Sequence, residues 1–136
     1  MKPITFYHNV QIYYEDTDHS GVVYHPNFLK YFERAREHVI GCEWLKQLWN
    51  EQGLGFAVYK ANQVFQQGVV FATLGEVRSQ VVLEGKYKTI WDQSFWLEGE
   101  TKPAVKAEIE MVCMDKNKQL RPIPQGLIDQ LQTQTA

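Results

Sequence analysis

The residues of this chain whose types and spacing could do chemistry lie together in residues 14–27. This segment falls at the predicted junction between a strand and a helix, and it contains two carboxylates, a glycine and a histidine: Asp16, Asp18, Gly21 and His25. Such a junction can present a side-chain base and the unpaired amides of a helix N-terminus to one reacting atom. The arrangement suits attack on a polarised carbonyl, with a carboxylate as base or nucleophile and the amides as donors to the oxyanion.

The elements on either side of this segment are predicted from sequence periodicity. Residues 4–15 alternate between apolar and polar positions, which is the period of a half-buried strand. Short polar residues and a glycine over 16–21 then predict a loop. Pro26 suits the first position of a helix because its missing N–H has no partner there. The N-cap is therefore His25, or Asn27 in a later register.

A single long helix is predicted over about residues 26–50, with Gly41 as its weak point and with Gly53 and Gly55 ending it. Apolar residues recur in it at spacings of three and four. This pattern predicts a wide stripe that is buried against another layer. The stripe comprises Phe28, Tyr31, Phe32, Ala35, Val39, Cys42, Leu45 and Trp49.

The rest of the chain is predicted to be a sheet. Turn residues at 84–86, 98–100 and 115–118 separate strands and imply antiparallel neighbours. One helix and one curved sheet make an α+β layer arrangement, and the two open edges of the sheet predict a homodimer. The predicted strands are about 56–67, 76–86, 89–99 and 104–115, followed by a short helix at 125–132.

Composition narrows the class of protein. A chain of 136 residues with 44% hydrophobic residues predicts one domain, residues 1–136, with a substantial core. The 14 basic and 16 acidic residues argue against binding to nucleic acid or to an anionic membrane. Cys42 and Cys113 are predicted to be buried free thiols. We find no secretion signal and no apolar span, so we expect a cytoplasmic protein.

Other kinds of site fit the sequence less well. No His-x-x-x-His or Cys-x-x-Cys spacing supports a metal site. Ser20 lacks the glycines of a nucleophile elbow, and no glycine-rich phosphate loop is present. Surface cations that could meet the phosphates of a nucleotide are Arg78, Lys86 and Lys88. The aromatic run of Trp91, Phe95 and Trp96 is either sheet core or the wall of an acyl tunnel.

Three runs of residues together resemble the hotdog-fold acyl-CoA thioesterases. They are Tyr14-Glu15-Asp16-Thr17-Asp18, Gly21-Val22-Val23-Tyr24-His25-Pro26-Asn27-Phe28 and Tyr31-Phe32-Glu33-Arg34-Ala35-Arg36. Within that superfamily the chain is similar to the 4-hydroxybenzoyl-CoA thioesterase group, and most to the branch typified by the thioesterase of the Tol–Pal gene cluster. Members commonly carry an aspartate near the start of the third strand, where residues 73–77 of this chain have none.

The resemblance implies a hotdog fold, with a long central helix wrapped by a five-stranded antiparallel sheet, assembled as homodimers or homotetramers. It implies that Asp18 is the essential carboxylate. His25 matches the histidine of the Tol–Pal-type branch. We expect Gly21, Val23 and Tyr24 to support the oxyanion site and the loop, with backbone donors from the helix N-terminus near residues 23–25, and Asp16 and Thr17 to hold the loop. No cofactor is expected beyond the CoA that forms part of the substrate.

The expected activity is hydrolysis of acyl-CoA or acyl-carrier-protein thioesters to a free acid and a thiol. Asp18 would be the nucleophile or the general base, and the sequence leaves both routes open. One alternative is a hydratase or dehydratase acting on acyl carrier protein, with a base on the helix, where the candidates are Glu33, Glu37 and His38. Another is a non-catalytic acyl-binding protein, against which the joint presence of Asp18, Gly21 and His25 speaks.

Overall fold

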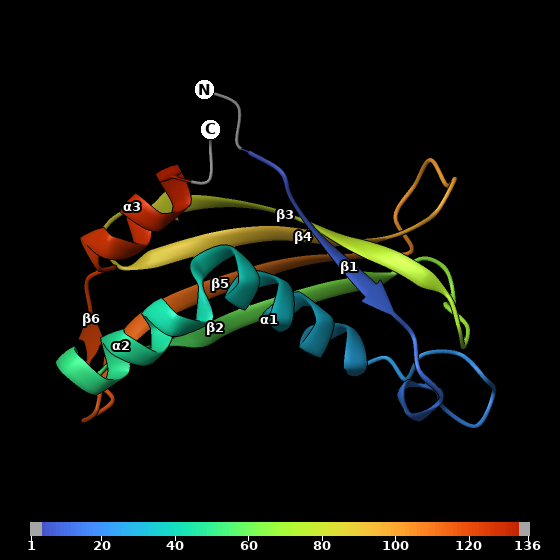
Figure 1. Ribbon diagram of the computed structural model, residues 1–136, viewed down its shortest axis with the longest axis horizontal. Helices are drawn as coiled ribbons and strands as arrows, with labels where there is room; N and C mark the ends of the chain where they lie inside the picture. The colour runs from blue at the N-terminus through green and yellow to red at the C-terminus, as the bar shows by residue number, and fades with distance from the viewer. Residues whose placement is uncertain (1–3, 134–136) are drawn as a thin grey trace.

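The computed structural model describes residues 4–133 and shows one antiparallel sheet with helices along one of its faces (Figure 1). The strand order is β1-β3-β4-β5-β2, and the short β6 pairs with β5. The elements are β1 (Phe6–Gln11), a 3-10 turn η1 (Tyr14–Asp16), α1 (Asn27–Ile40), α2 (Cys42–Gln52), β2 (Leu54–Phe65), β3 (Leu74–Glu84), β4 (Lys88–Leu97), β5 (Val105–Asp115), β6 (Leu120–Arg121) and α3 (Gln125–Thr133).

The core lies between the helices and the inner face of the sheet. Alternation along each strand directs every second side chain toward α1, which is why the inner residues of β3, β4 and β5 are buried. The α+β layer arrangement expected from the sequence is confirmed, as are the three predicted antiparallel turns. The core includes Phe28, Phe32, Ala35 and Val39 from α1, and Val77, Trp91, Phe95 and Ile109 from the sheet.

The prediction of one continuous helix was wrong. Gly41 has φ 103° and ψ 116°, a backbone conformation that favours glycine and that no helix contains, so it divides the segment into α1 and α2. The break also changes the phase of the apolar stripe. Leu48 is the buried residue of α2, whereas Trp49, predicted to be buried, is 47% exposed.

The first strand is shorter than predicted. β1 ends at Gln11, and the chain turns through η1, so that Tyr14 is 81% exposed instead of sharing the buried face of the strand. Both cysteines are free, but only Cys113 is buried, because Cys42 begins α2 on its outer side. Within the described part of the chain, no helix is long and apolar enough to cross a membrane.

Gly75 allows the start of β3 to pack closely against β4. A Cβ atom at this position would lie 2.6 Å from the ring of Phe95 and 2.9 Å from the carbonyl oxygen of Trp96. The Phe95 ring in turn contacts Phe28 and Tyr31 at the start of α1, at ring-centroid distances of 5.4 and 6.0 Å. The absence of a side chain at residue 75 therefore leaves room for the Phe95 ring, which packs against the first turns of α1.

We expect Gly75→Ala to lower the free energy of unfolding by about 1–3 kcal/mol, because the added methyl group overpacks the Phe95 ring. Gly55→Ala is the matched control, since a Cβ there meets Trp49 at an ordinary 3.5 Å. Urea unfolding of both variants measures the difference. Equal stability of the two variants would contradict the close packing at residue 75.

Candidate active site

The segment that carries the predicted catalytic residues connects β1 to α1 at one end of the sheet (Figure 1). Backbone hydrogen bonds pair it with the connection between β2 and β3. Ile12 donates to Thr73 (2.9 Å), and Val23 donates to Val69 (2.7 Å). We call residues 12–26 the catalytic loop. It is held along both of its sides and is not a free loop.

Asp16 is the hydrogen-bonding centre of the catalytic loop. Its carboxylate accepts the N–H of Tyr13 (2.7 Å) and thereby closes η1. Its carbonyl oxygen accepts both the N–H of Tyr24 (2.9 Å) and the side-chain amide of Asn27 (2.8 Å). These bonds join the start of the loop to the start of α1, so Asp16 contributes to the geometry of the loop. Thr17 adds a bond from its hydroxyl to the carbonyl of Tyr14 (2.8 Å).

Asp18 is exposed, and its carboxylate is held by Ser20. Oδ1 accepts both the hydroxyl of Ser20 (2.7 Å) and its backbone N–H (2.8 Å). The Ser20 hydroxyl is the main cause that holds the pKa of the Asp18 carboxyl below its ordinary value. Only Oδ1 is engaged in these bonds, so Oδ2 is available to attack or to accept a proton from water.

Not all of the backbone amides expected at this site are open. Gly21, Val23 and Tyr24 all donate inside the chain, to the carbonyls of Asp18, Val69 and Asp16 respectively. They support the loop but are not open toward a ligand. Within residues 4–133, no acceptor takes the backbone N–H of His25, the last amide before Pro26 and α1. The open donor at the start of the helix is therefore His25.

The His25 side chain is exposed and stands among aromatic rings. Its ring centroid lies 5.0 Å from that of Tyr24 and 6.0 Å from that of Phe65, both in edge-on geometry. Phe65 ends β2 and also contacts Phe28, at 6.0 Å. Periodicity could not have predicted the contact between His25 and Phe65, because it joins residues of two elements that are far apart in the sequence.

Tyr31 is a second residue near the site that the sequence pattern did not single out. The sequence analysis places it in the apolar stripe and in the third run of the family resemblance, and gives it no chemical role. Its hydroxyl oxygen is buried and has no hydrogen-bond partner within the described residues. Burial, followed by the negative charge of Asp16, raises the pKa of this hydroxyl well above its ordinary range. Tyr31 is therefore a neutral hydroxyl donor, close enough to the catalytic loop for the charge of Asp16 to act on it.

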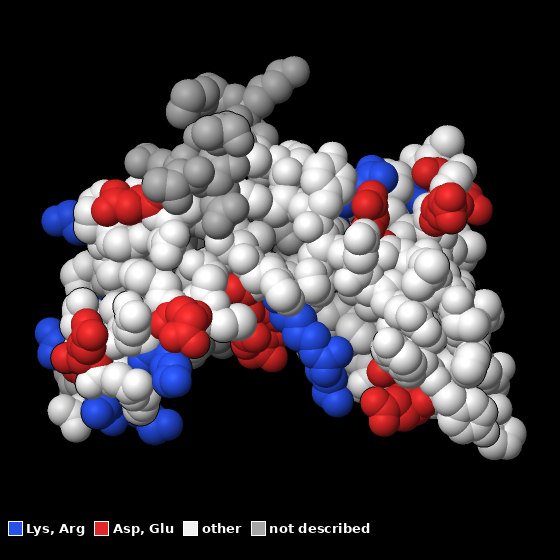
Figure 2. Space-filling model, viewed as in Figure 1, with Lys and Arg blue, Asp and Glu red and all other residues white. Residues whose placement is uncertain are grey.

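Exposed apolar side chains lie along the catalytic loop and along the segment between β2 and β3 that pairs with it. In Figure 2 the lower right of the surface, at this end of the molecule, is mostly uncharged. An exposed apolar group of this extent commonly marks an interaction site. The exposed large apolar residues here are Tyr14, Tyr24, Phe65, Val70, Phe71 and Leu74.

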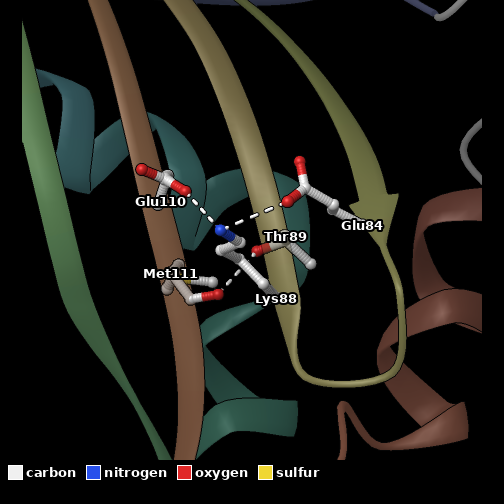
Figure 3. A network of polar contacts seen from close by, with 5 residues as sticks. All are labelled: Glu84, Lys88, Thr89, Glu110 and Met111. Atoms are coloured by element: carbon white, nitrogen blue, oxygen red, sulfur yellow. Dashed lines mark hydrogen bonds and ion pairs between the residues drawn. The ribbon is translucent and has the colours of Figure 1, made fainter.

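Two of the three cations considered for a nucleotide are already paired. Lys88 donates to Glu110 (2.6 Å) and pairs with Glu84 (3.3 Å), as Figure 3 shows, and these contacts raise the pKa of its amine. Arg78 pairs with Glu76 (2.8 Å) at a cavity of about 750 Å³ on the outer face of the sheet, and this cavity does not include Asp18. Lys86 is exposed. Among the described residues, no group of three or more His, Cys, Asp or Glu side chains could hold a metal ion.

Comparison with known proteins identifies the family. A model of the thioesterase-like superfamily matches residues 13–131. The chain belongs to this superfamily. It is 33% identical over 116 residues to the acyl-CoA thioesterase YbgC of Haemophilus influenzae, covering 84% of this chain and 83% of that protein. It is 25% identical over 130 residues to the acyl-CoA thioester hydrolase YbgC of an Escherichia coli strain, covering 94% and 96%.

Solved structures confirm the hotdog fold of this superfamily member. A 1,4-dihydroxy-2-naphthoyl-CoA thioesterase from Synechocystis matches with a TM-score of 0.85 and 21% identity, over 93% of this chain and 95% of that chain. The helix of the fold is divided at Gly41, and β6 adds a two-residue sixth strand to the expected five. The resemblance inferred from residues 14–36 is confirmed by both comparisons.

We expect Ser20→Ala to raise the pKa of Asp18 toward the ordinary value of about 3.9, because the largest stabilising bond to the carboxylate is lost. In the native chain the lowered pKa favours the folded state above about pH 4, and this contribution is lost as the pH falls through the folded-state pKa. Carboxyl ¹³C titration by NMR measures the shift. Ser94→Ala is the control, because the Ser94 hydroxyl accepts its hydrogen bond from the Trp96 indole N–H and not from a carboxyl group. An unchanged Asp18 pKa in Ser20→Ala would contradict the role of the hydroxyl.

Proposed function

We propose that this protein hydrolyses acyl-CoA thioesters to a free acid and CoA, with Asp18 as nucleophile or general base. The observation that carries the proposal is the position of Asp18 in a member of the thioesterase-like superfamily. The Asp18 carboxylate lies on the hydrogen-bonded loop that also carries the open amide of His25 and leads into α1. The acyl-CoA thioesterases named above are relatives over most of their length. Acyl groups on carrier protein would undergo the same chemistry.

The chain supplies the parts that thioester hydrolysis requires. The His25 N–H and the positive end of the α1 dipole favour negative charge on the carbonyl oxygen. In one route, Asp18 attacks the carbonyl carbon, the C–S bond breaks, CoA leaves as a thiolate that takes a proton from water, and a second water hydrolyses the mixed anhydride. In the other, Asp18 removes a proton from the water that attacks. The His25 imidazole can orient water or protonate the leaving sulfur.

No observation favours the hydratase alternative. It needs a base on the helix that faces the substrate. Glu33 and His38 are exposed, and the His38 ring stacks on His8, on the β1 side of α1. Glu37 lies one turn farther along α1 than Glu33, away from the catalytic loop.

We further propose that a second copy of the chain completes the site. β2 is an edge strand, bonded only to β5, and most of its residues from Val58 to Phe65 are exposed on both faces. An exposed, apolar edge of this length is normally covered in a native protein. Phe65 belongs to this strand and contacts His25, so a partner that covers β2 also encloses the catalytic loop. Tetramer formation and cytoplasmic location stay predictions.

We expect Asp18→Asn to fold normally and to lose activity by about 10²-fold or more, since it removes the base or nucleophile. Release of free thiol from short, long and aromatic acyl-CoAs measures the loss. Asp92→Asn, an exposed carboxylate on the outer face of β4, is the control with the same change of charge. Wild-type turnover by the Asp18 variant would exclude the assignment.

We expect sedimentation to show a dimer, and the specific activity to fall on dilution below the dissociation constant of that dimer. The physical reason is that the apolar surface beside Asp18 and His25 is covered only in the pair. A chain that sediments as a monomer at every concentration and keeps full activity would contradict the proposed role of the partner.

A further inference from the structure

A small cavity lies between β1, α1 and β3, on the side of α1 that faces the β1 edge of the sheet. Its volume is about 120 Å³, room for about four water molecules at roughly 30 Å³ each, or for one small ion. Its polar side chains are those of two histidines and one serine. The residues that line it are Phe6, Tyr7, His8, Ala35, His38, Val39 and Ser79.

The two histidines form a stacked pair across the interface between β1 and α1. The ring centroids of His8 and His38 are 4.4 Å apart, with 30° between the ring planes. The pKa of His8 is lowered, first by burial and then by the positive charges of His38 and Arg34, both on α1. From β3, Val77 lies opposite His8 and Ser79 lines the cavity, so β3 brings no charge to it. The charged groups acting on His8 are all basic.

Behind the cavity, a chain of hydrogen bonds runs from a buried cation to Ser79. Arg36 donates to Oε1 of Gln93 (2.9 Å), and Nε2 of Gln93 donates to Oγ of Ser79 (3.0 Å). Ser79 Oγ is thus an acceptor on its inner side. No acceptor for the Ser79 hydroxyl hydrogen is found within residues 4–131, so this hydrogen is free to point into the cavity. Every bond of the chain therefore has its donor on the Arg36 side and its acceptor on the cavity side.

Arg36 is an unusual residue to find in this position. Its side chain is buried, only 5% of the residue is exposed, and none of the ion pairs among the described residues includes it. Burial lowers its pKa, and the carboxylates of Glu33 and Glu37 on the same helix act against that only from beyond ion-pair distance. A buried charge without a paired counter-ion is costly, and a negative charge at the end of its hydrogen-bond chain would reduce that cost.

We propose that this cavity is a binding site for a small inorganic oxyanion of the phosphate or sulfate class. Three side chains that can donate hydrogen bonds line it, the imidazoles of His8 and His38 and the hydroxyl of Ser79. Arg34 and Arg36 supply positive charge from α1. Nothing in this site takes part in the proposed thioesterase chemistry. The proposal stands or falls independently of that function.

Binding is coupled to protonation, and its sign follows from the surroundings. In the free protein, burial and the neighbouring cations lower the pKa of His8, so its protonation opposes folding as the pH falls below the ordinary histidine pKa of about 6.5. An anion in the cavity reverses this by favouring the imidazolium. The bound ion also links β1 to α1. The catalytic loop starts where β1 ends and stops where α1 begins. Anion binding therefore stabilises the frame that holds Asp18.

Titration of the protein with sodium sulfate, followed by imidazole ¹H–¹⁵N NMR, tests the site. Sulfate is the probe because its charge is constant over the working pH range, so any pH dependence of binding belongs to the protein. We expect the signals of His8 and His38 to shift and saturate, and their pKa values to rise. The signals of His19 and His25, on the catalytic loop, serve as internal controls and should stay unchanged. Sodium chloride at equal ionic strength corrects for screening.

We expect the dissociation constant for sulfate to be several-fold lower at about pH 6 than at about pH 8, approaching tenfold per pH unit where one proton is taken up on binding. Calorimetry at the two pH values measures this. Ser79→Ala and His38→Gln should each weaken binding by about tenfold, by loss of one charge-assisted hydrogen bond. Lys46→Gln, an exposed cation on α2, is the control and should leave it unchanged.

Three results would overturn the proposal. One is an equal response of all four histidines to sulfate and to chloride, which shows screening alone. Another is sulfate binding that Lys46→Gln weakens as much as Ser79→Ala does. The last is the absence of saturable sulfate binding to the folded wild-type protein at both pH values. Because the measurements use no thioester, failure here leaves the proposed hydrolase activity untouched.

Discussion

The backbone pairing between the catalytic loop and residues 69–73 is the constraint on which the rest of the site depends. Ile12 is bonded both to Thr73 and to Ala72, and farther along the loop Val22 and Val23 pair with Val70 and Val69. The loop is therefore an extension of the sheet edge, and not a free connection between β1 and α1. Gly21, Val23 and Tyr24 donate within the chain, whereas the His25 amide, just before the N-cap Pro26 of α1, has no acceptor among the described residues.

The polar residues of this chain satisfy two opposite electrostatic conditions. Asp18 is an exposed charge whose pKa is lowered by hydrogen bonds, so it is ionised at neutral pH and free to react. Arg36 is a buried charge that donates to Gln93, and Gln93 in turn donates to Ser79, which lines the cavity on the β1 side of the helix. Asp18 lies on the loop that precedes α1, whereas Arg36 lies near the far end of α1, and the core residues Phe28, Phe32, Ala35 and Val39 lie along the helix between the two ends.

Predictions from local sequence pattern succeeded where the burial of each residue follows directly from the periodicity of its element. The strands from β2 to β5 lie within about two residues of the predicted ranges, because alternation reflects burial of one face of a sheet. The prediction of the helix failed at Gly41. Apolar residues keep a spacing of three and four on both sides of this glycine, so the pattern does not reveal that the helix is divided or that α2 buries a different face. The prediction of the first strand failed at Tyr14, because the apolar alternation of the sequence continues past the end of β1 into the turn η1.

The sequence by itself determined the order of elements, the class of fold and the segment that holds the candidate catalytic residues. These follow from residues within a few positions of each other, whose periodicity and turn chemistry are visible without a fold. Tertiary structure alone decided which amide is open, which aromatic ring contacts His25, and which side chain accepts the hydrogen bond of Arg36. Arg36 and Gln93, for example, are 57 positions apart. Contacts of this kind depend on strand order and register, and no local pattern encodes either of them.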